Sequence, residues 1–214
     1  MKERLKRIWE PRQLPAGRAV PAAAAALIFG GALGVFAKWL DNLALDGGVW
    51  WHRILGRLDL GNFFSRIAVW LLAALLIAVF ARTAWQAALN VFLFFAGMCA
   101  AYHLWTLAYS GFDPGSYMLI WYGITLASPV LAVFCWYAKG DGPAAFILST
   151  AVTAVFWLAC FAIGIFYIDP LSLPEVLVFL GAAAALYRNW KRTAGSLAAG
   201  LALAFLLNPV WPYH

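Results

Sequence analysis

Long, uninterrupted runs of apolar residues alternate along this chain with short polar segments. Seven runs come close to the roughly 20 residues that a helix needs to cross about 30 Å of hydrocarbon. These runs are Val20–Leu40, Phe64–Ala81, Trp85–Tyr109, Tyr117–Ala138, Ala144–Ile168, Leu171–Tyr187 and Ala194–Val210. Because each run is continuously apolar, and not apolar at every second position, the pattern predicts membrane-spanning helices instead of barrel strands.

The last two runs are the shortest, at about 17 residues each. Helices of that length would have to stand nearly upright or lie in thinner bilayer. The expected architecture is therefore an all-α, polytopic transmembrane bundle of about seven spans. Six spans are the alternative, with one short run entering and leaving the membrane on the same side.

The segment between the first two runs, from Asp41 to Phe63, carries a helical pattern of its own. Its apolar side consists of Trp50, Trp51, Ile54, Leu55 and Leu58, and its polar side of His52, Arg53, Arg57 and Asp59. This division is typical of an amphipathic helix that lies in the membrane interface. We expect it on the outer face.

Composition supports a membrane protein. Apolar residues make up 65% of the 214 residues and charged residues 11%, whereas soluble domains average about 45–50% and about 25%. A soluble fold of this size could not bury so much apolar surface. We expect a basic cytoplasmic arm over residues 1–19 and a single transmembrane domain over residues 20–211. The net charge of +6 does not indicate nucleic-acid binding, because the basic residues lie at span ends and not on one face.

The distribution of lysine and arginine predicts the orientation, because short cytoplasmic segments are enriched in both. With the arm inside, the inner segments hold 11 of the 15 basic residues. These are Lys2, Arg4, Lys6, Arg7, Arg12, Arg18, Arg82, Lys139, Arg188, Lys191 and Arg192. Seven spans would then place the C-terminus outside the cell membrane.

Small residues form a stripe on the first span. Its members are Ala23, Ala26, Gly30, Gly34 and Ala37. Small residues let helix backbones approach closely in lipid, where no hydrophobic drive operates between helices. We expect this stripe to pack inside the chain, and the alternative is docking on a membrane partner subunit or a second copy.

Polar residues are rare inside the predicted spans. Asn90 shares a helix face with Gly97 in the third span, which predicts close packing and one interhelical hydrogen bond. Trp157 lies in the middle of the fifth predicted span, where its indole N–H needs an internal acceptor. No second ligand stands at metal spacing from His103.

The outer ends of several spans carry residues that could line a small pocket. Lys38 and Asp41 stand three residues apart on one helix face. In a purely structural role, the lysine would extend its ammonium group to the membrane surface and the aspartate would cap the helix end. The alternative is a polar vestibule, to which His103, Asp113, Tyr117 and Trp121 would contribute.

No catalytic motif occurs: HExxH, GxSxG, the P-loop and GxGxxG are all missing. We therefore assign no catalytic residue, metal ligand or cofactor. The three cysteines, Cys99, Cys135 and Cys160, all lie in apolar runs, and we interpret them as packing residues.

Several short motifs together resemble an uncharacterised family of small multi-span membrane proteins found mainly in bacteria. They are Gly61-Asn62-Phe63-Phe64-Ser65-Arg66, Asn90-Val91-Phe92-Leu93-Phe94-Phe95 with Gly97-Met98, Ser116-Tyr117, Ile120-Trp121, Ser128-Pro129 and Cys135-Trp136-Tyr137-Ala138-Lys139-Gly140. The resemblance covers roughly Gly30 to Gly142. It implies a membrane architecture, in a bacterial inner membrane, and no activity.

Two kinds of function fit these observations. The first is a non-enzymatic membrane component, either a small-solute binding or transport subunit or a partner-docking module. The second is an intramembrane enzyme at the outer face, acting on lipid or peptide, with His52, Asp59, His103 and Asp113 as the candidate groups. A purely structural or regulatory protein is a third.

The orientation can be tested by labelling. In the Lys191→Cys variant, with the three native cysteines replaced, we expect a membrane-impermeant maleimide to react only from the cytoplasmic side. Reaction in intact cells, without permeabilisation, would reverse the predicted topology.

Overall fold

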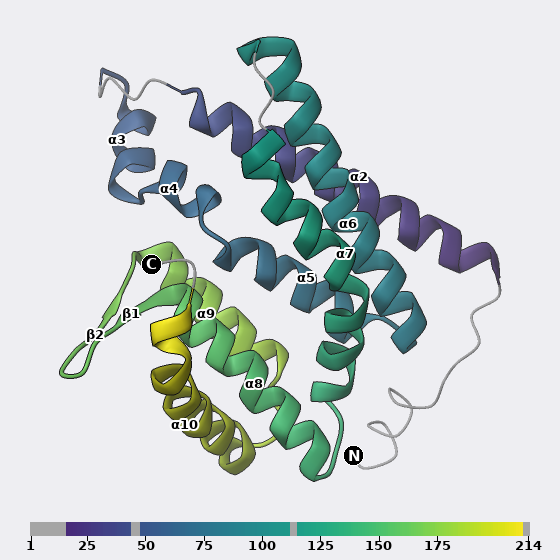
Figure 1. Ribbon diagram of the computed structural model, residues 1–214, viewed down its shortest axis with the longest axis vertical. Helices are drawn as coiled ribbons and strands as arrows, with labels where there is room; N and C mark the ends of the chain where they lie inside the picture. The colour runs from purple at the N-terminus through teal and green to yellow at the C-terminus, as the bar shows by residue number, and fades with distance from the viewer. Residues whose placement is uncertain (1–15, 44–47, 112–114, 212–214) are drawn as a thin grey trace. The chain divides into compact units, whose positions relative to one another are not determined.

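The computed structural model describes residues 16–43, 48–111 and 115–211 (Figure 1). The described chain is predominantly α-helical, as the sequence predicts. Five helices are long and apolar enough to cross a membrane. They are α2 (Ala16–Asp41), α6 (Ala84–Trp105), which continues into a π-helical turn (Thr106–Ser110), α7 (Gly115–Ala138), α8 (Pro143–Cys160) and α10 (Trp190–Leu207), which ends in a 3-10 turn (Asn208–Val210).

Two further apolar helices are much shorter. Helices α5 (Ala68–Phe80) and α9 (Leu173–Ala185) have 13 residues each. Thirteen residues extend about 20 Å, which is about two thirds of the hydrocarbon thickness. The amphipathic pattern before α5 folds as helix α3 (Trp50–Arg57), followed by helix α4 (Leu60–Ser65).

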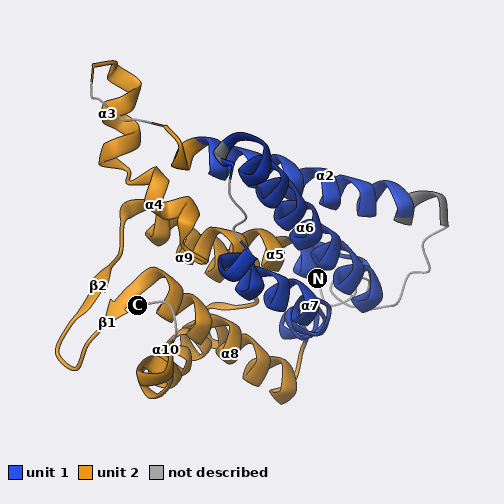
Figure 2. Cartoon of the chain, turned by 45° about the horizontal axis from the view of Figure 1, so that its top comes forward, with its two compact units in different colours: residues 1–39, 77–140 blue, residues 40–76, 141–214 orange. Residues whose placement is uncertain are grey.

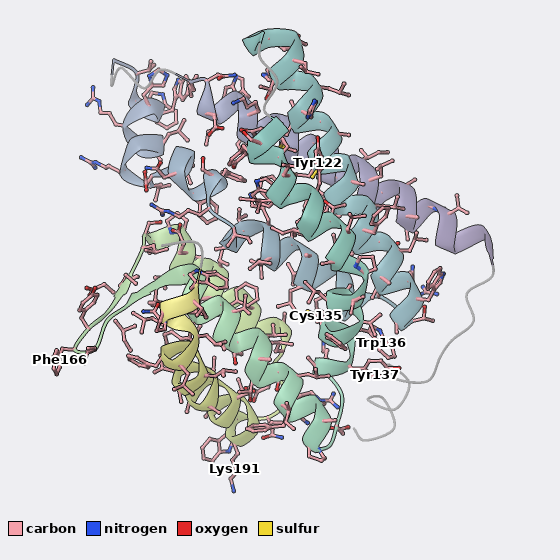
Figure 3. All side chains as sticks on the ribbon, in the orientation of Figure 1. Tyr122, Cys135, Trp136, Tyr137, Phe166 and Lys191 are labelled. Atoms are coloured by element: carbon pink, nitrogen blue, oxygen red, sulfur yellow. The ribbon has the colours of Figure 1, made fainter. Side chains whose placement is uncertain are left out.

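One expected span ends earlier than its apolar run. The run Ala144–Ile168 is helical only to Cys160, and the chain then forms an antiparallel hairpin of β1 (Phe161–Ile163) and β2 (Ile168–Pro170). Aromatic and β-branched residues dominate this stretch, and such residues favour strands over helix. The hairpin tip is apolar and exposed, with Phe166 at its end (Figure 3).

The chain divides into two compact units (Figure 2). Unit 1 comprises residues 1–39 and 77–140, and unit 2 comprises residues 40–76 and 141–214. Unit 1 therefore contains nearly all of α2, with α6 and α7. Unit 2 contains α3, α4, most of α5, α8, the hairpin, α9 and α10. We describe each unit separately.

In unit 1, helices α2 and α6 pack in backbone contact. A methyl group added at Gly30 would overlap the carbonyl of Phe94, and one at Gly34 would lie 2.8 Å from the carbonyl oxygen of Met98. Contacts therefore advance in the same direction along both helices, which makes the pair parallel. From the other side, a methyl group at Gly97 would overlap the carbonyl of Leu27.

In unit 2, helices α8 and α10 are also parallel and also pack through a glycine. A methyl group at Gly200 would overlap the hydroxyl of Thr153, which donates a hydrogen bond to the carbonyl of Ser196 at 2.9 Å. Trp157, expected to need an internal acceptor, donates from Nε1 to the carbonyl of Leu197 at 3.1 Å. Near the ends of the pair, Asn208 Nδ2 donates to the carbonyl of Ile163 at 2.9 Å.

Parallel packing determines the path of the chain between the paired helices. If both members of a pair span the membrane in one direction, the connecting segment must cross back. Among the described residues, the only apolar helix between α2 and α6 is α5, and the only one between α8 and α10 is α9. In a chain of seven spans, these two short helices would be the return crossings.

Helices α5 and α9 are followed by similar turns. Thr83 caps α6 by accepting a hydrogen bond from the backbone N–H of Gln86 at 3.1 Å. Asn189 caps α10 in the same way, accepting from the N–H of Arg192 at 2.9 Å. Two helix trios, α2–α5–α6 and α8–α9–α10, thus each contain a long helix, a short one and a long one, with the first and third in parallel contact. This repetition of structure was not visible as a sequence repeat.

We expect neighbouring glycines of α2 to respond oppositely to alanine. Gly30→Ala should lower the free energy of unfolding by about 1–3 kcal/mol, because the methyl group meets the backbone of α6. Gly31→Ala should be neutral or stabilising by up to about 1 kcal/mol, since its nearest contact would be 3.7 Å away and alanine favours helix. Reversible unfolding in mixed micelles measures both, and equal effects would refute the packing shown by the structure.

Candidate functional site

A buried ion pair joins the beginnings of the two short helices. Arg66 lies two residues before α5, and Glu175 lies in the first turn of α9. The guanidinium Nη1 is 2.6 Å from Glu175 Oε1, and Ser172 donates its hydroxyl proton to Oε2 of the same carboxylate. The Glu175 side chain is fully buried, whereas that of Arg66 is 31% exposed.

Arg66 also binds a second carboxylate. Its Nη2 is 3.0 Å from Asp59 Oδ2, and Asn62 Nδ2 donates to Asp59 Oδ1 at 2.7 Å. Asp59 is the residue before α4 and has a left-handed backbone, with φ of 52°. This conformation turns the chain between α3 and α4, where the Asp59 carboxylate contacts Arg66. The guanidinium thus bridges one buried and one partly exposed carboxylate.

Two effects stabilise the charge of Glu175 in its buried position. The arginine and the serine satisfy both carboxylate oxygens, which offsets part of the desolvation cost. The N-terminus of α9 adds the positive end of the helix dipole. Nearby, a methyl group at Gly181 would lie 3.3 Å from Leu72, so α9 and α5 pack against each other beyond the ion pair.

The sequence analysis assigned no role to Glu175. The available signal was Ser172-x-x-Glu175, the pattern of a capping box at a helix start. That pattern predicts where α9 begins. It says nothing about Arg66, which is 109 positions away.

Two candidates for the vestibule, Lys38 and Tyr117, lie near the same tyrosine in unit 1. Lys38 Nζ lies 5.0 Å from the ring centroid of Tyr102 and 3.5 Å from its hydroxyl, and the Tyr102 ring is 6.1 Å from that of Tyr117. His103 has a different partner, with its Nδ1 2.7 Å from the hydroxyl of Tyr122. Lys38 and Tyr117 are thus brought near a common tyrosine.

The other vestibule candidates have separate surroundings. Asp41 belongs to unit 2, where its Oδ1 accepts a hydrogen bond from the hydroxyl of Ser65 at 3.2 Å. Trp121 is 7% exposed, and its carbonyl accepts from the hydroxyl of Thr125 at 2.8 Å. Asp113 lies outside the described residues, as do residues 1–15 of the predicted arm.

The candidate catalytic groups His52 and Asp59 contact side chains of unit 2, and His103 lies in unit 1. His52 is 9% exposed, and its ring packs edge-on against Trp51 with centroids 3.9 Å apart. Asp59 is held by Arg66 and Asn62. His103 belongs to unit 1, whereas His52 and Asp59 belong to unit 2.

We expect the ion pair to contribute to the free energy of unfolding mainly because Arg66 pairs with the Glu175 carboxylate, which would otherwise be a buried, unpaired charge. Glu175→Ala should cost about 3 kcal/mol, because it leaves Arg66 half-buried beside an apolar hole, and Arg66→Met should cost at least as much. The double variant Arg66→Met/Glu175→Met should recover most of the loss. Asp59→Asn, at the exposed end, should cost less than about 1 kcal/mol. A double variant as unstable as the sum of its singles would refute this.

Comparison with protein-family models, with curated proteins and with solved structures finds no match to this chain. The resemblance in the short sequence motifs therefore has no support from a family model, and no activity can be transferred. The helices show a polytopic membrane architecture, and function has to be argued from the site alone.

Proposed function

We propose that this protein is a non-enzymatic membrane component that binds and transports a small polar solute. One observation carries the proposal: two unusually short helices hold corresponding positions in two similar helix trios, and a buried ion pair joins Arg66, two residues before α5, to Glu175 in the first turn of α9. In transporters built from repeats, such a pair of short apolar segments points to the binding site.

The ion pair would serve as a gate. Arg66 keeps a second partner in Asp59, so separation from Glu175 would not leave the guanidinium unpaired. Glu175 would then exchange Arg66 for water or for a cationic group of the solute. A solute with an anionic group could compete for Arg66 in the same step. The pair therefore favours a zwitterionic or charged solute over a neutral one.

The same proposal places the chain in a cell membrane as a multi-pass protein with a cytoplasmic N-terminus. The lipid bilayer would cover the exposed apolar faces, including Ile28 and Leu126, which are 69% and 75% exposed. Helix α3 would lie in the outer interface, because Trp50 is 71% exposed on a helix whose other face is charged. We further propose that this membrane is a bacterial inner membrane, as the resemblance of the short sequence motifs implies.

The buried thiol of Cys160 offers a native reporter for the gate. It is fully buried and lies close enough to Glu175 to interact with its charge. With Cys99 and Cys135 replaced by alanine, we expect a charged, impermeant methanethiosulfonate to modify Cys160 slowly in proteoliposomes. Glu175→Gln should speed this reaction at least tenfold, because a broken gate admits water.

Asp59→Asn is the matched control, since it loosens the network without releasing Glu175, and it should leave the rate within about twofold. Thermal unfolding of each variant separates gating from loss of structure. If Cys160 of the folded Glu175→Gln variant stays unreactive, no aqueous path opens at this pair, and a structural role replaces the proposed transport.

A further inference from the structure

A groove of about 440 Å³ lies on unit 1 and is lined mainly by apolar side chains. Helix α2 contributes Ala22, Ala26 and Phe29, and the end of α5 contributes Ile77 and Phe80. This volume falls within the range of about 300–1,000 Å³ that is common for small-molecule sites. All these residues belong to unit 1, whereas Arg66 and Glu175 belong to unit 2, so the inference does not rest on the proposed transport site.

One buried polar atom in the groove lacks a partner. Asn90 lines the groove and is 7% exposed, and its Oδ1 forms no hydrogen bond within the described part of the chain. The interhelical bond expected from the sequence is therefore not made by this oxygen. A buried acceptor left unpaired destabilises the protein, because it has lost its hydrogen bonds to water without replacement. An occupant with an O–H or N–H donor would remove that cost.

The end of the groove near the start of α6 is cationic. Arg82 lines it with an exposed side chain, and no carboxylate among the described residues pairs with it. Lys139 Nζ stands 4.3 Å from the ring centroid of Phe80 at the same end. Asn90 lies six residues into α6, about 9 Å further along the axis. The lining thus has a positive rim, an apolar wall and a deep acceptor.

We propose that this groove binds a small lipophilic acid that carries a hydroxyl or N–H group on its apolar body. The anionic end of the ligand lies at Arg82, its carbon chain lies against the alanines of α2, and its donor reaches Asn90 Oδ1. An ordinary acyl chain of the bilayer fills the same walls but leaves the Asn90 oxygen unpaired. The donor is therefore the feature by which the groove would select its ligand.

The test uses three probes that differ by one group: ω-hydroxydecanoate, decanoate and decanediol. Each competes with a photoreactive decanoate for the protein in phosphatidylcholine nanodiscs, and cross-linked peptides are identified by mass spectrometry. In the unmodified protein, cross-links should fall in residues 22–29 and 77–90, and ω-hydroxydecanoate should compete about tenfold better than decanoate, the value of one hydrogen bond.

Variants assign each preference to one side chain. Asn90→Leu should abolish the advantage of the hydroxyl, and Arg82→Gln should abolish the advantage of ω-hydroxydecanoate over decanediol. Partitioning into the bilayer is a property of the probe, so it cancels when variants are compared. Asn90→Leu should also raise the unfolding temperature, because it removes an unpaired buried oxygen.

Thr150→Val is the matched control. The Thr150 hydroxyl in α8 of unit 2 is also buried and has no hydrogen-bond partner in the described chain, so its removal should stabilise the protein and leave competition unchanged. The proposal is overturned if the hydroxyl gives no advantage in the unmodified protein. It is also overturned if the advantage survives in Asn90→Leu or if the cross-links map outside the groove peptides.

Discussion

Backbone contact between parallel helices is the constraint on which the rest of this structure depends. Gly30, Gly97 and Gly200 each stand where a single methyl group would collide with the neighbouring helix. In hydrocarbon no hydrophobic drive holds helices together, so dispersion at close range and interhelical hydrogen bonds have to do so. Because the contacts join helices of the same direction, the chain must cross back between them. The short helices α5 and α9 follow from that requirement.

The short helices α5 and α9 each begin near one residue of the ion pair. Each of these helices has 13 residues and extends about 20 Å, which is less than the hydrocarbon thickness, so charges at its beginning would lie closer to lipid than those at the end of a full-length span. A charge in such a position is costly unless it is paired. Arg66 and Ser172 supply the partners of the Glu175 carboxylate.

The two units handle buried polarity in different ways. In unit 2, Glu175 has its arginine and serine, and Trp157 has the carbonyl of Leu197. In unit 1, Asn90 has a buried oxygen with no hydrogen-bond partner among the described residues, beside a groove with a cation at its rim. A satisfied network favours one arrangement of helices, whereas an unsatisfied acceptor favours an occupant. The ion pair and the groove are therefore separate sites with separate chemistry.

The sequence by itself determined the class of fold, the positions of the helices and the pairing face of α2, because these follow from local apolar runs and from small residues at helical spacing. It also indicated that Trp157 would need an acceptor. Only the tertiary structure decided that α8 ends at Cys160, that α2 and α6 run parallel, and that Arg66 meets Glu175 across 109 positions. The apolar composition of a helix does not depend on which other helix it packs against. The relative direction and pairing of two helices depend on whether their backbones can approach closely, and this is decided by the residues of both helices together.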